Sequence, residues 1–345
     1  MSQFPPLRIG ILGAADIARA FCAAAAASPL LDVAAVASRN AGKAAAFAAE
    51  FRIRRAHPGY EALLADAEVE AVYVPLPNDL HAEWAIRAAE AGKHVLCEKP
   101  LAMTADEARA MFAAARTHGV LLREAYPYMA QPQTLRLREL LREGVVGRVR
   151  SLSATMGFRI VTPEGEPLCD PANIRLQPER GGGALLDAGT YAMSMLRLLA
   201  GERPVRVWAT ADYTPKGVDH TLAATLRFAG GAIGQLGCSI ATASNRFAMV
   251  AGEAGALRTD FSNHAPAGGR LPLWVKRGAP LTVPFAMEEM PGVNGFAAEA
   301  DSFAHAVRLG AAEWNGATEA ESVDTVLSLQ AIAKCARTGG WVEVG

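Results

Sequence analysis

The sequence carries almost no net charge and no long hydrophobic run. Its 34 lysines and arginines against 35 aspartates and glutamates leave a formal charge of −1, so nothing favours nucleic acid or an anionic membrane as a partner. The start of the chain, MSQFPPLRIGILG, lacks the charged residues and the long apolar stretch of a secretory signal. The longest apolar tract, FCAAAAAS, is too short to cross a bilayer. We therefore expect a cytoplasmic protein that binds neither nucleic acid nor membrane.

Cysteine is also scarce, and no two cysteines have the spacing of a metal site. An odd number of scattered cysteines favours reduced thiols over a disulfide framework. The histidines show no ligand spacing either, so the sequence predicts no metal centre. The cysteines are Cys22, Cys97, Cys169, Cys238 and Cys335.

The first third of the chain contains short apolar stretches that alternate with helix-forming, alanine-rich stretches. Because parallel strands need crossover helices between them, this alternation predicts an α/β fold with a doubly wound parallel sheet. The expected strands are residues 7–13, 31–38, 69–77, 93–100 and 119–126.

The pattern changes from about Val149. Strand-like stretches joined by glycine turns follow, and one helix interrupts them early. They predict an open, mostly antiparallel sheet, with helices again near the end of the chain. A length of 345 residues is enough for about two domains. We expect residues 1–125 to form the first and residues 126–345 the second, with a C-terminal tail that can return to the first.

A degenerate dinucleotide fingerprint follows the first expected strand. The stretch GAADIA has the form G-x-A-x-x-A between a strand and a helix. Gly13 permits the tight turn, and the amides that open the helix can receive a pyrophosphate. Ala15 stands where glycine usually lets the backbone approach phosphate, and small-residue turns are common, so the motif alone leaves cofactor binding open. The candidate contacts are Gly13, Ala14, Ala15, Asp16 and Ile17.

The end of the second expected strand favours NADP(H). A site for NAD usually has an acidic residue there for the ribose hydroxyls, but this chain has Ser38, Arg39 and Asn40, with Lys43 one turn further. A hydroxyl, a guanidinium and an ammonium suit a 2′-phosphate. The alternative is a solvated basic patch at a helix start, and NAD stays open as the cofactor.

Two later strands end in loops with candidate cofactor contacts. Ligands of open α/β sheets bind outside the carboxyl ends of the strands, where the stretches PLPNDLH and CEKP lie. Lys99 precedes Pro100, which biases it to an extended conformation, although lysines at strand ends are more often simply exposed. The candidates in these loops are Pro75, Pro77, Asn78, His81, Glu98 and Lys99.

The helical stretch GGGALLDAGTYAMSMLR, residues 181–197, carries a carboxylate and a phenol among apolar residues. Asp187 and Tyr191 are four positions apart, about one helical turn, so both would project from one face roughly 6 Å apart. The alternative is structural: an aspartate near a helix start is often a dipole partner, and a tyrosine among Leu, Met and Ala is usually a core residue.

Several stretches together resemble the Gfo/Idh/MocA oxidoreductase family. They are GILGAADIA, VYVPLPNDLHAEWAIRAAEAGKHVLCEKPLAMTADEA, EAYPYMAQPQ and GGGALLDAGTYA. The resemblance implies an N-terminal Rossmann domain, and a C-terminal α/β domain whose open sheet commonly forms a dimer face. It also implies hydride transfer between a nicotinamide and a sugar-like or cyclic alcohol. A homodimer or homotetramer built through the C-terminal sheet is therefore expected.

By this resemblance Lys99 corresponds to the catalytic lysine, Asp187 to the carboxylate of the helix motif, and Tyr191 to a position where many members have histidine. Tyrosine there is similar to a subset with aldose (xylose-type) dehydrogenases, glucose–fructose oxidoreductases and dihydrodiol dehydrogenases. The chain departs from the family where Met129, Ala130 and Gln131 replace an arginine–aromatic–histidine run, so the polyol that fits is open. The candidate substrate contacts are Lys99, Tyr126, Asn173, Arg175, Asp187 and Tyr191.

The resulting hypothesis assigns roles in hydride transfer to Tyr191, Lys99 and Asp187. Tyr191 accepts the substrate's hydroxyl proton while a hydride leaves the same carbon for the nicotinamide. Lys99 favours the phenolate and polarises the substrate oxygen, and Asp187 orients Lys99 or binds a neighbouring hydroxyl. The three glycines bring the helix start close to the cofactor, and His81 shapes the nicotinamide loop.

Two other functions stay open for this chain. One is a non-catalytic NADP(H)-sensing regulator, and the other is an NAD-dependent glycoside-cleaving enzyme on the same fold.

Overall fold

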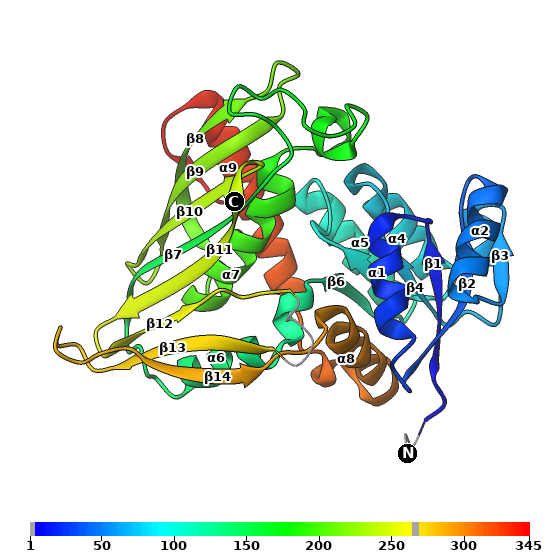
Figure 1. The fold of residues 1–345 in the computed structure, drawn as a ribbon, viewed down its shortest axis with the longest axis horizontal. Coiled ribbons are helices and arrows are strands. Elements are labelled where there is room, and N and C mark those ends of the chain that lie inside the picture. The colour runs from blue at the N-terminus through cyan, green and yellow to red at the C-terminus, as the bar shows by residue number, and fades with distance from the viewer. Residues whose placement is uncertain (1–3, 264–268) are drawn as a thin grey trace. The chain divides into compact units, whose positions relative to one another are not determined.

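The computed structural model describes residues 4–263 and 269–345. They form two compact units. Unit 1 combines residues 1–102, 106–131 and 293–319, and unit 2 combines residues 103–105, 132–292 and 320–345. Each unit has its own sheet, shown as a ribbon in Figure 1. Over the described ranges, no helix combines the length and the apolar character needed to cross a membrane.

Unit 1 contains a six-stranded parallel sheet in the order β3-β2-β1-β4-β5-β6. The strand order reverses between β1 and β4, which makes this the position where open α/β sheets bind ligands. The strands are β1 (Leu7–Leu12), β2 (Leu31–Ala37), β3 (Arg55–His57), β4 (Ala71–Val74), β5 (His94–Glu98) and β6 (Leu122–Ala125). The expected doubly wound sheet is thus confirmed.

Helices follow these strands as the alternation predicted. They are α1 (Asp16–Ala25), α2 (Ala41–Phe51), α3 (Tyr60–Leu64), α4 (His81–Glu90), α5 (Ala105–Thr117) and, from late in the chain, α8 (Gly295–Leu309). Short 3₁₀ turns lie at η1 (Asn78–Leu80), η2 (Pro127–Ala130) and η6 (Ala311–Glu313). Nearly every residue of β1 and β4 is buried, because helices cover both faces of a parallel sheet.

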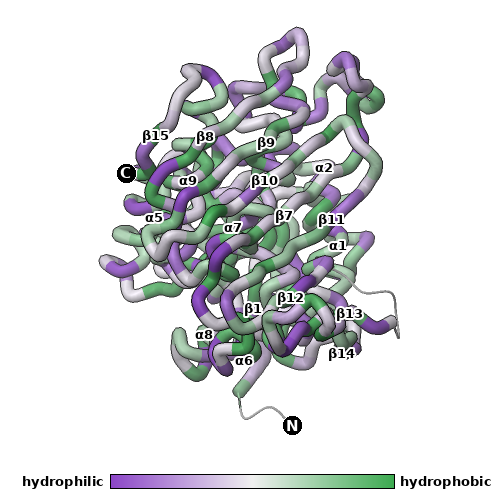
Figure 2. The backbone as a smooth tube through the Cα atoms, turned by 90° about the vertical axis from the view of Figure 1, so that its left-hand side faces the viewer, coloured by the Kyte–Doolittle hydropathy of each residue, from purple (hydrophilic) through white to green (hydrophobic). Residues whose placement is uncertain are grey.

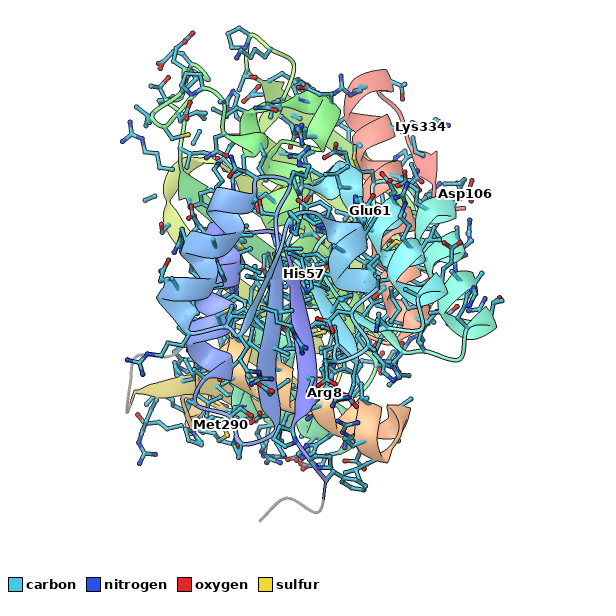
Figure 3. All side chains as sticks on the ribbon, turned by 90° about the vertical axis from the view of Figure 1, so that its right-hand side faces the viewer. Arg8, His57, Glu61, Asp106, Met290 and Lys334 are labelled. Atoms are coloured by element: carbon cyan, nitrogen blue, oxygen red, sulfur yellow. The ribbon has the colours of Figure 1, made fainter. Side chains whose placement is uncertain are left out.

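The core of unit 1 joins the N-terminal part of the chain to α8. Phe21 of α1 stacks on Tyr73 of β4 with ring centroids 4.0 Å apart, and Phe303 of α8 lies in the same apolar cluster. Arg308 of α8 also donates two hydrogen bonds to the Glu70 carboxylate, at 2.8 and 3.0 Å. Arg8, labelled in Figure 3 on β1, forms a 3.2 Å ion pair with the same carboxylate. These contacts hold α8 in unit 1 although it follows most of unit 2 in the chain.

Unit 2 contains a nine-stranded mixed sheet in the order β14-β13-β12-β11-β7-β10-β9-β8-β15. Among the described strands of this sheet, β7 and β10 pair in parallel and the other neighbours pair antiparallel. The strands are β7 (Val149–Arg159), β8 (Pro204–Tyr213), β9 (Asp219–Phe228), β10 (Ile233–Ser239), β11 (Ala241–Gly252), β12 (Gly255–Thr259), β13 (Arg270–Arg277), β14 (Ala286–Pro291) and β15 (Val342–Glu343). The expected open, mostly antiparallel sheet is confirmed.

One face of this sheet is covered by helices. The helices of unit 2 are α6 (Pro132–Arg142), α7 (Thr190–Ala200) and α9 (Glu319–Thr338), and α7 packs on β7, β10 and β11. Short turns at η3 (Ile174–Leu176), η4 (Pro178–Arg180) and the π-helical η5 (Leu185–Gly189) precede α7. Burial alternates along β9, as it does in a sheet with one packed and one open face. Figure 2 looks onto β8, β9, β10 and β7 side by side, with hydrophilic and hydrophobic positions interspersed along them.

Candidate active site

The turn after β1 has the geometry that the fingerprint predicted. Gly13 has φ +121°, and its N–H donates to the Ala37 carbonyl at 2.9 Å. A Cβ at this position would lie 3.0 Å from Leu76 Cδ2, so both conformation and space favour glycine. Ala15 is the N-cap of α1 and has no side-chain acceptor. The first N–H groups of α1 are therefore available to a phosphate.

The other residues of the fingerprint differ in exposure. Ala14 and Ala15 are partly buried against the core of unit 1. Asp16 and Ile17 are exposed in the first turn of α1, and Ile17 is an unusually exposed large apolar side chain at 39%.

The basic end of β2 is organised by its own side chains. Ser38 Oγ accepts from the Asn40 N–H at 3.2 Å, and Asn40 caps α2 by accepting from the Lys43 N–H at 3.0 Å. The side chains of Arg39 and Lys43 are exposed.

Sequence reasoning missed Tyr60. Burial raises the pKa of its hydroxyl, and the nearby Arg39 guanidinium opposes this shift.

Tyr60 also lies beside the phosphate turn. Its oxygen is 4.0 Å from the position of a Cβ at Gly13. The structure thus brings Gly13 and Arg39 together around one buried phenol, which no local sequence pattern revealed.

His81 joins the loops that follow β4 and β5. Its ring is fully buried, with Nδ1 2.9 Å from the Pro100 carbonyl oxygen and Nε2 2.8 Å from that of Leu76. Burial lowers the pKa of His81, and the two carbonyl contacts oppose this shift. A buried ring between two backbone carbonyls fits the positioning of loops. His81 therefore links the loop of Pro75, Pro77 and Asn78 to the loop of Lys99.

Two buried carboxylates hold the loop of Lys99. Glu98 Oε1 accepts from the Tyr73 hydroxyl at 2.5 Å, and Glu98 Oε2 accepts from the Lys99 N–H at 3.2 Å. Beyond the cis bond between Lys99 and Pro100, the Leu101 N–H donates to Glu124 Oε1 at 2.9 Å. Lys99 itself is half-buried. The backbone that carries Lys99 is therefore fixed on both sides.

The stretch after β6 lies in the interior. Tyr126 is only 1% exposed and packs edge-on against Tyr128, with centroids 5.9 Å apart. Met129, Ala130 and Gln131, which depart from the family pattern, are also buried. Gln131 Nε2 donates to the carbonyl of residue 293 at 2.8 Å. These three residues therefore pack in the interior of unit 1, and Gln131 contacts the chain where it returns to this unit at residue 293.

In unit 2 the helix that carries Asp187 and Tyr191 begins differently from expectation. The spacing predicted a regular α-helix, but Leu185–Gly189 is a π-helical turn, and α7 starts only at Thr190. Asp187 lies in the π turn and Tyr191 in the first turn of α7. Irregular turns of this kind occur often at functional sites.

The glycines before this helix make room for neighbours in unit 2. A Cβ at Gly182 would lie 2.7 Å from the Arg175 carbonyl oxygen, and one at Gly183 would lie 2.1 Å from Asp219 Oδ1. Gly183 also has φ +120°. Asp219 accepts from the Leu185 N–H at 2.7 Å, and burial raises the pKa of its carboxyl to about 6. The structure shows a packing reason for Gly182 and Gly183, and the close approach to the cofactor that the sequence suggested stays a prediction.

Asn173, Arg175 and Asp187 are brought together. Asn173 Oδ1 accepts from the Arg175 N–H at 3.0 Å, and Arg175 Nε donates to Asp187 Oδ2 at 2.5 Å. The Asp187 carboxylate raises the pKa of Arg175, and Tyr191 adds a smaller effect in the same direction. The Arg175 side chain is 43% exposed and that of Asp187 13%. Asp187 is thus an ion-pair partner at the start of the helix.

Tyr191 is 7% exposed and has two further neighbours that sequence reasoning missed. Asn263 Nδ2 donates to the Tyr191 hydroxyl at 3.2 Å. The Arg246 guanidinium carbon lies 5.0 Å from the centroid of the Tyr191 ring. Both residues lie more than fifty positions along the chain from Tyr191 and belong to no motif. No signal in the sequence pointed to them.

A doubly wound parallel sheet with an open phosphate turn, and a mostly antiparallel sheet packed against the helix that carries Tyr191 beside charged groups, define a two-domain dinucleotide-dependent oxidoreductase. Comparison with known families agrees. Residues 7–126 match the Gfo/Idh/MocA model described as an oxidoreductase family with an NAD-binding Rossmann fold, and residues 134–258 match the C-terminal domain of the same group. The chain belongs to the Gfo/Idh/MocA oxidoreductase family, which confirms the resemblance seen in the sequence.

Individual relatives match nearly the whole length of the chain. It is 36% identical over 340 residues to D-xylose 1-dehydrogenase (NADP(+)) 2 of Haloferax volcanii, covering 98% of this chain and 100% of the relative. A 3-ketoreductase from Actinomadura kijaniata, solved with NADP and TDP-benzene, is 34% identical with a TM-score of 0.82, over 95% of this chain and 97% of that one. Aldose-aldose oxidoreductase from Caulobacter crescentus, complexed with glycerol, is 27% identical with a TM-score of 0.85, over 98% and 99% of the chains.

Proposed function

We propose that this oxidoreductase transfers a hydride between NADP(H) and a carbon of a sugar or cyclic polyol, by aldose C1 oxidation or keto-sugar reduction. The observation that carries the proposal is the setting of Tyr191. Its hydroxyl accepts from Asn263, and the Arg175–Asp187 ion pair lies at the π turn that leads into its helix. The sugar-acting relatives support this substrate class.

The residues of unit 1 fit a phosphorylated dinucleotide. The free N–H groups at the start of α1 and the space kept by Gly13 suit a pyrophosphate. Arg39 and Lys43, exposed at the end of β2 where no acid stands, suit the 2′-phosphate of NADP. The NADP named in two of the relatives supports this choice.

When bound, the nicotinamide accepts or supplies the hydride. During oxidation, Tyr191 takes the proton of the substrate hydroxyl and the carbon gives up its hydride, which leaves a carbonyl. During reduction, Tyr191 returns the proton to the new alkoxide. An ordinary tyrosine has a pKa of about 10, so the ammonium of Lys99 serves to favour the phenolate and to polarise the substrate oxygen. Arg175 and Asp187 bind neighbouring hydroxyls of the substrate.

The open face of the unit 2 sheet serves assembly in this proposal. Trp208 on β8 and Ile233 on β10 are exposed at 42% and 40%. We assign this face to a homodimer or homotetramer, as the family resemblance implied.

The test uses purified protein with NADP⁺ or NAD⁺ and a panel of aldoses, inositols and diols, followed by the absorbance of the reduced cofactor. Lys99→Met and Tyr191→Phe should each lower kcat/KM by about 10²–10⁴-fold, the range of an acid–base group. Lys334→Met and Tyr213→Phe are matched controls; Lys334 is exposed on α9 (Figure 3), and Tyr213 also has an arginine over its ring. Wild-type turnover by Tyr191→Phe, or tight cofactor binding without turnover on any substrate, would contradict the proposal.

A further inference from the structure

Arg246 of β11 is held in one position over the Tyr191 ring. Its guanidinium carbon lies 5.0 Å from the centroid of Tyr191 and 5.3 Å from that of Phe261. Its Nη1 donates to the Phe261 carbonyl at 3.1 Å, and its Nη2 lies 3.2 Å from Met156 Sδ. These contacts leave the cation little freedom to turn toward solvent.

The segment that follows β12 supplies the second contact. Phe261 is fully buried with φ +34°, an unfavourable conformation for a bulky residue, and its N–H donates to Thr259 Oγ1 at 2.9 Å. Two residues later, Asn263 Nδ2 donates to the Tyr191 hydroxyl oxygen at 3.2 Å. Strained backbone persists where surrounding contacts impose it and is common at functional sites.

Both contacts act on the same side of the phenol–phenolate equilibrium. A cation over an aromatic face is attracted by its electrons, and this attraction grows when the ring carries negative charge. A donor at the oxygen favours the charged form over the neutral form.

Within the described residues, two further titratable groups lie by the start of this helix. On the loop side, the Asp187 carboxylate is paired with Arg175. On the sheet side, Cys238 of β10 lies against the helix at Gly189, and burial raises the pKa of its thiol so far that it stays neutral. The thiol of Cys169 lies within electrostatic range of Arg175.

We propose that Arg246 and Asn263 form a phenolate clamp, a pair of positioning residues in unit 2 that stabilises the ionised form of Tyr191. The clamp rests on the proposed role of Tyr191 as acid and base. It adds a second source of phenolate stabilisation to Lys99, built entirely from the domain that carries the phenol.

The first test is the pH dependence of kcat/KM for alcohol oxidation. An opposite charge within about 4–6 Å shifts a pKa by one unit or more, so Arg246→Met should move the acidic limb of the profile to a pH about one unit higher. Arg246→Lys should move the limb by less, because lysine keeps the positive charge. Asn263→Ala should also move the limb to higher pH. At pH values above the limb the variants should approach wild-type kcat, which a general structural defect would not allow. Arg258→Met, which removes a guanidinium stacked on Phe247 and Trp274, is the control.

The second test needs no turnover. Ultraviolet titration of tyrosinate in the Arg246→Met and Asn263→Ala variants, each with and without Tyr191→Phe, isolates the ionisation of Tyr191 in every background. An upward shift of that ionisation supports the clamp, and an unchanged one overturns it. If Tyr191→Phe turns over substrate like the wild type, the proposed function is wrong, but the titration still tests whether Arg246 and Asn263 stabilise the phenolate. If Arg246→Met does not fold, titration of Arg246→Lys and Asn263→Ala tests the clamp in its place.

Discussion

At the scale of a single residue, we propose that the exposed Arg39 side chain selects the cofactor. It lies at the end of β2 beside the buried Tyr60 hydroxyl, which in turn lies near the Gly13 turn. The contact with Tyr60 restrains the Arg39 side chain. Less side-chain freedom is then lost when the guanidinium binds a phosphate, so the residue is preorganised for binding.

Arg39→Ala should therefore weaken NADPH binding by about 10–100-fold, since a hydrogen bond to a charged group contributes about 1.5–3 kcal/mol. NADH, which has no 2′-phosphate, should bind almost as before. Fluorescence titration with both cofactors measures the difference, with Arg109→Ala on the exposed face of α5 as the control. Equal losses for NADPH and NADH would place Arg39 outside the phosphate site.

At the scale of one element, the start of α7 depends on a residue from another strand. Asp219 of β9 accepts the Leu185 N–H at 2.7 Å, and Gly183 has no side chain because one would collide with this carboxylate. The π turn that follows carries Asp187 and leads to Tyr191. Asp219 thus binds the backbone at the start of the π turn that leads into α7.

The raised pKa of Asp219 gives this element a measurable pH signature. Burial raises the pKa of the carboxyl to about 6 from its ordinary 3.8, so between those values the folded state binds a proton more tightly than the unfolded chain. Stability from this group is therefore present below about pH 4 and is lost as the pH rises to about 6, by up to about 3 kcal/mol. Asp219→Asn should flatten the change of Tm across this window. Asp212→Asn, on the exposed side of β8, should keep the wild-type slope, and identical slopes in all three proteins would contradict this account.

The sequence could predict features that depend on neighbouring residues, but not those that depend on contacts between distant parts of the chain. The parallel sheet, the turn at Gly13 and the loop of Lys99 were predictable, because each depends on a local period or on residues a few positions apart. The π turn, the Tyr60 contact and the clamp on Tyr191 were not. They arise where Asp219, Arg246 and Asn263 approach from strands and loops distant in the chain, and such contacts leave no local pattern.

At the scale of the whole molecule, the open sheet of unit 2 raises the question of what covers it. A stable symmetric dimer buries about 800 Å² on each partner, and an open nine-stranded sheet offers a broad, regular surface for such a contact. On the outward side of β9 and β10, the small residues Ala223 and Gly237 lie opposite each other. Small side chains at the centre and exposed Trp208 and Ile233 further out allow two sheets to approach closely.

The proposed assembly makes a sharp prediction at Ala223. In a two-fold dimer each patch meets itself, so Ala223→Arg would introduce two charges into one interface. A buried charge without a partner costs about 3–5 kcal/mol, enough to raise the dissociation constant by at least about 10²-fold. Light scattering after size-exclusion chromatography should therefore show a lower mass for Ala223→Arg, and the wild-type mass for Ala27→Arg on the surface of unit 1. A folded Ala223→Arg protein of unchanged mass would exclude this face, and the two subunits would have to meet elsewhere or not at all.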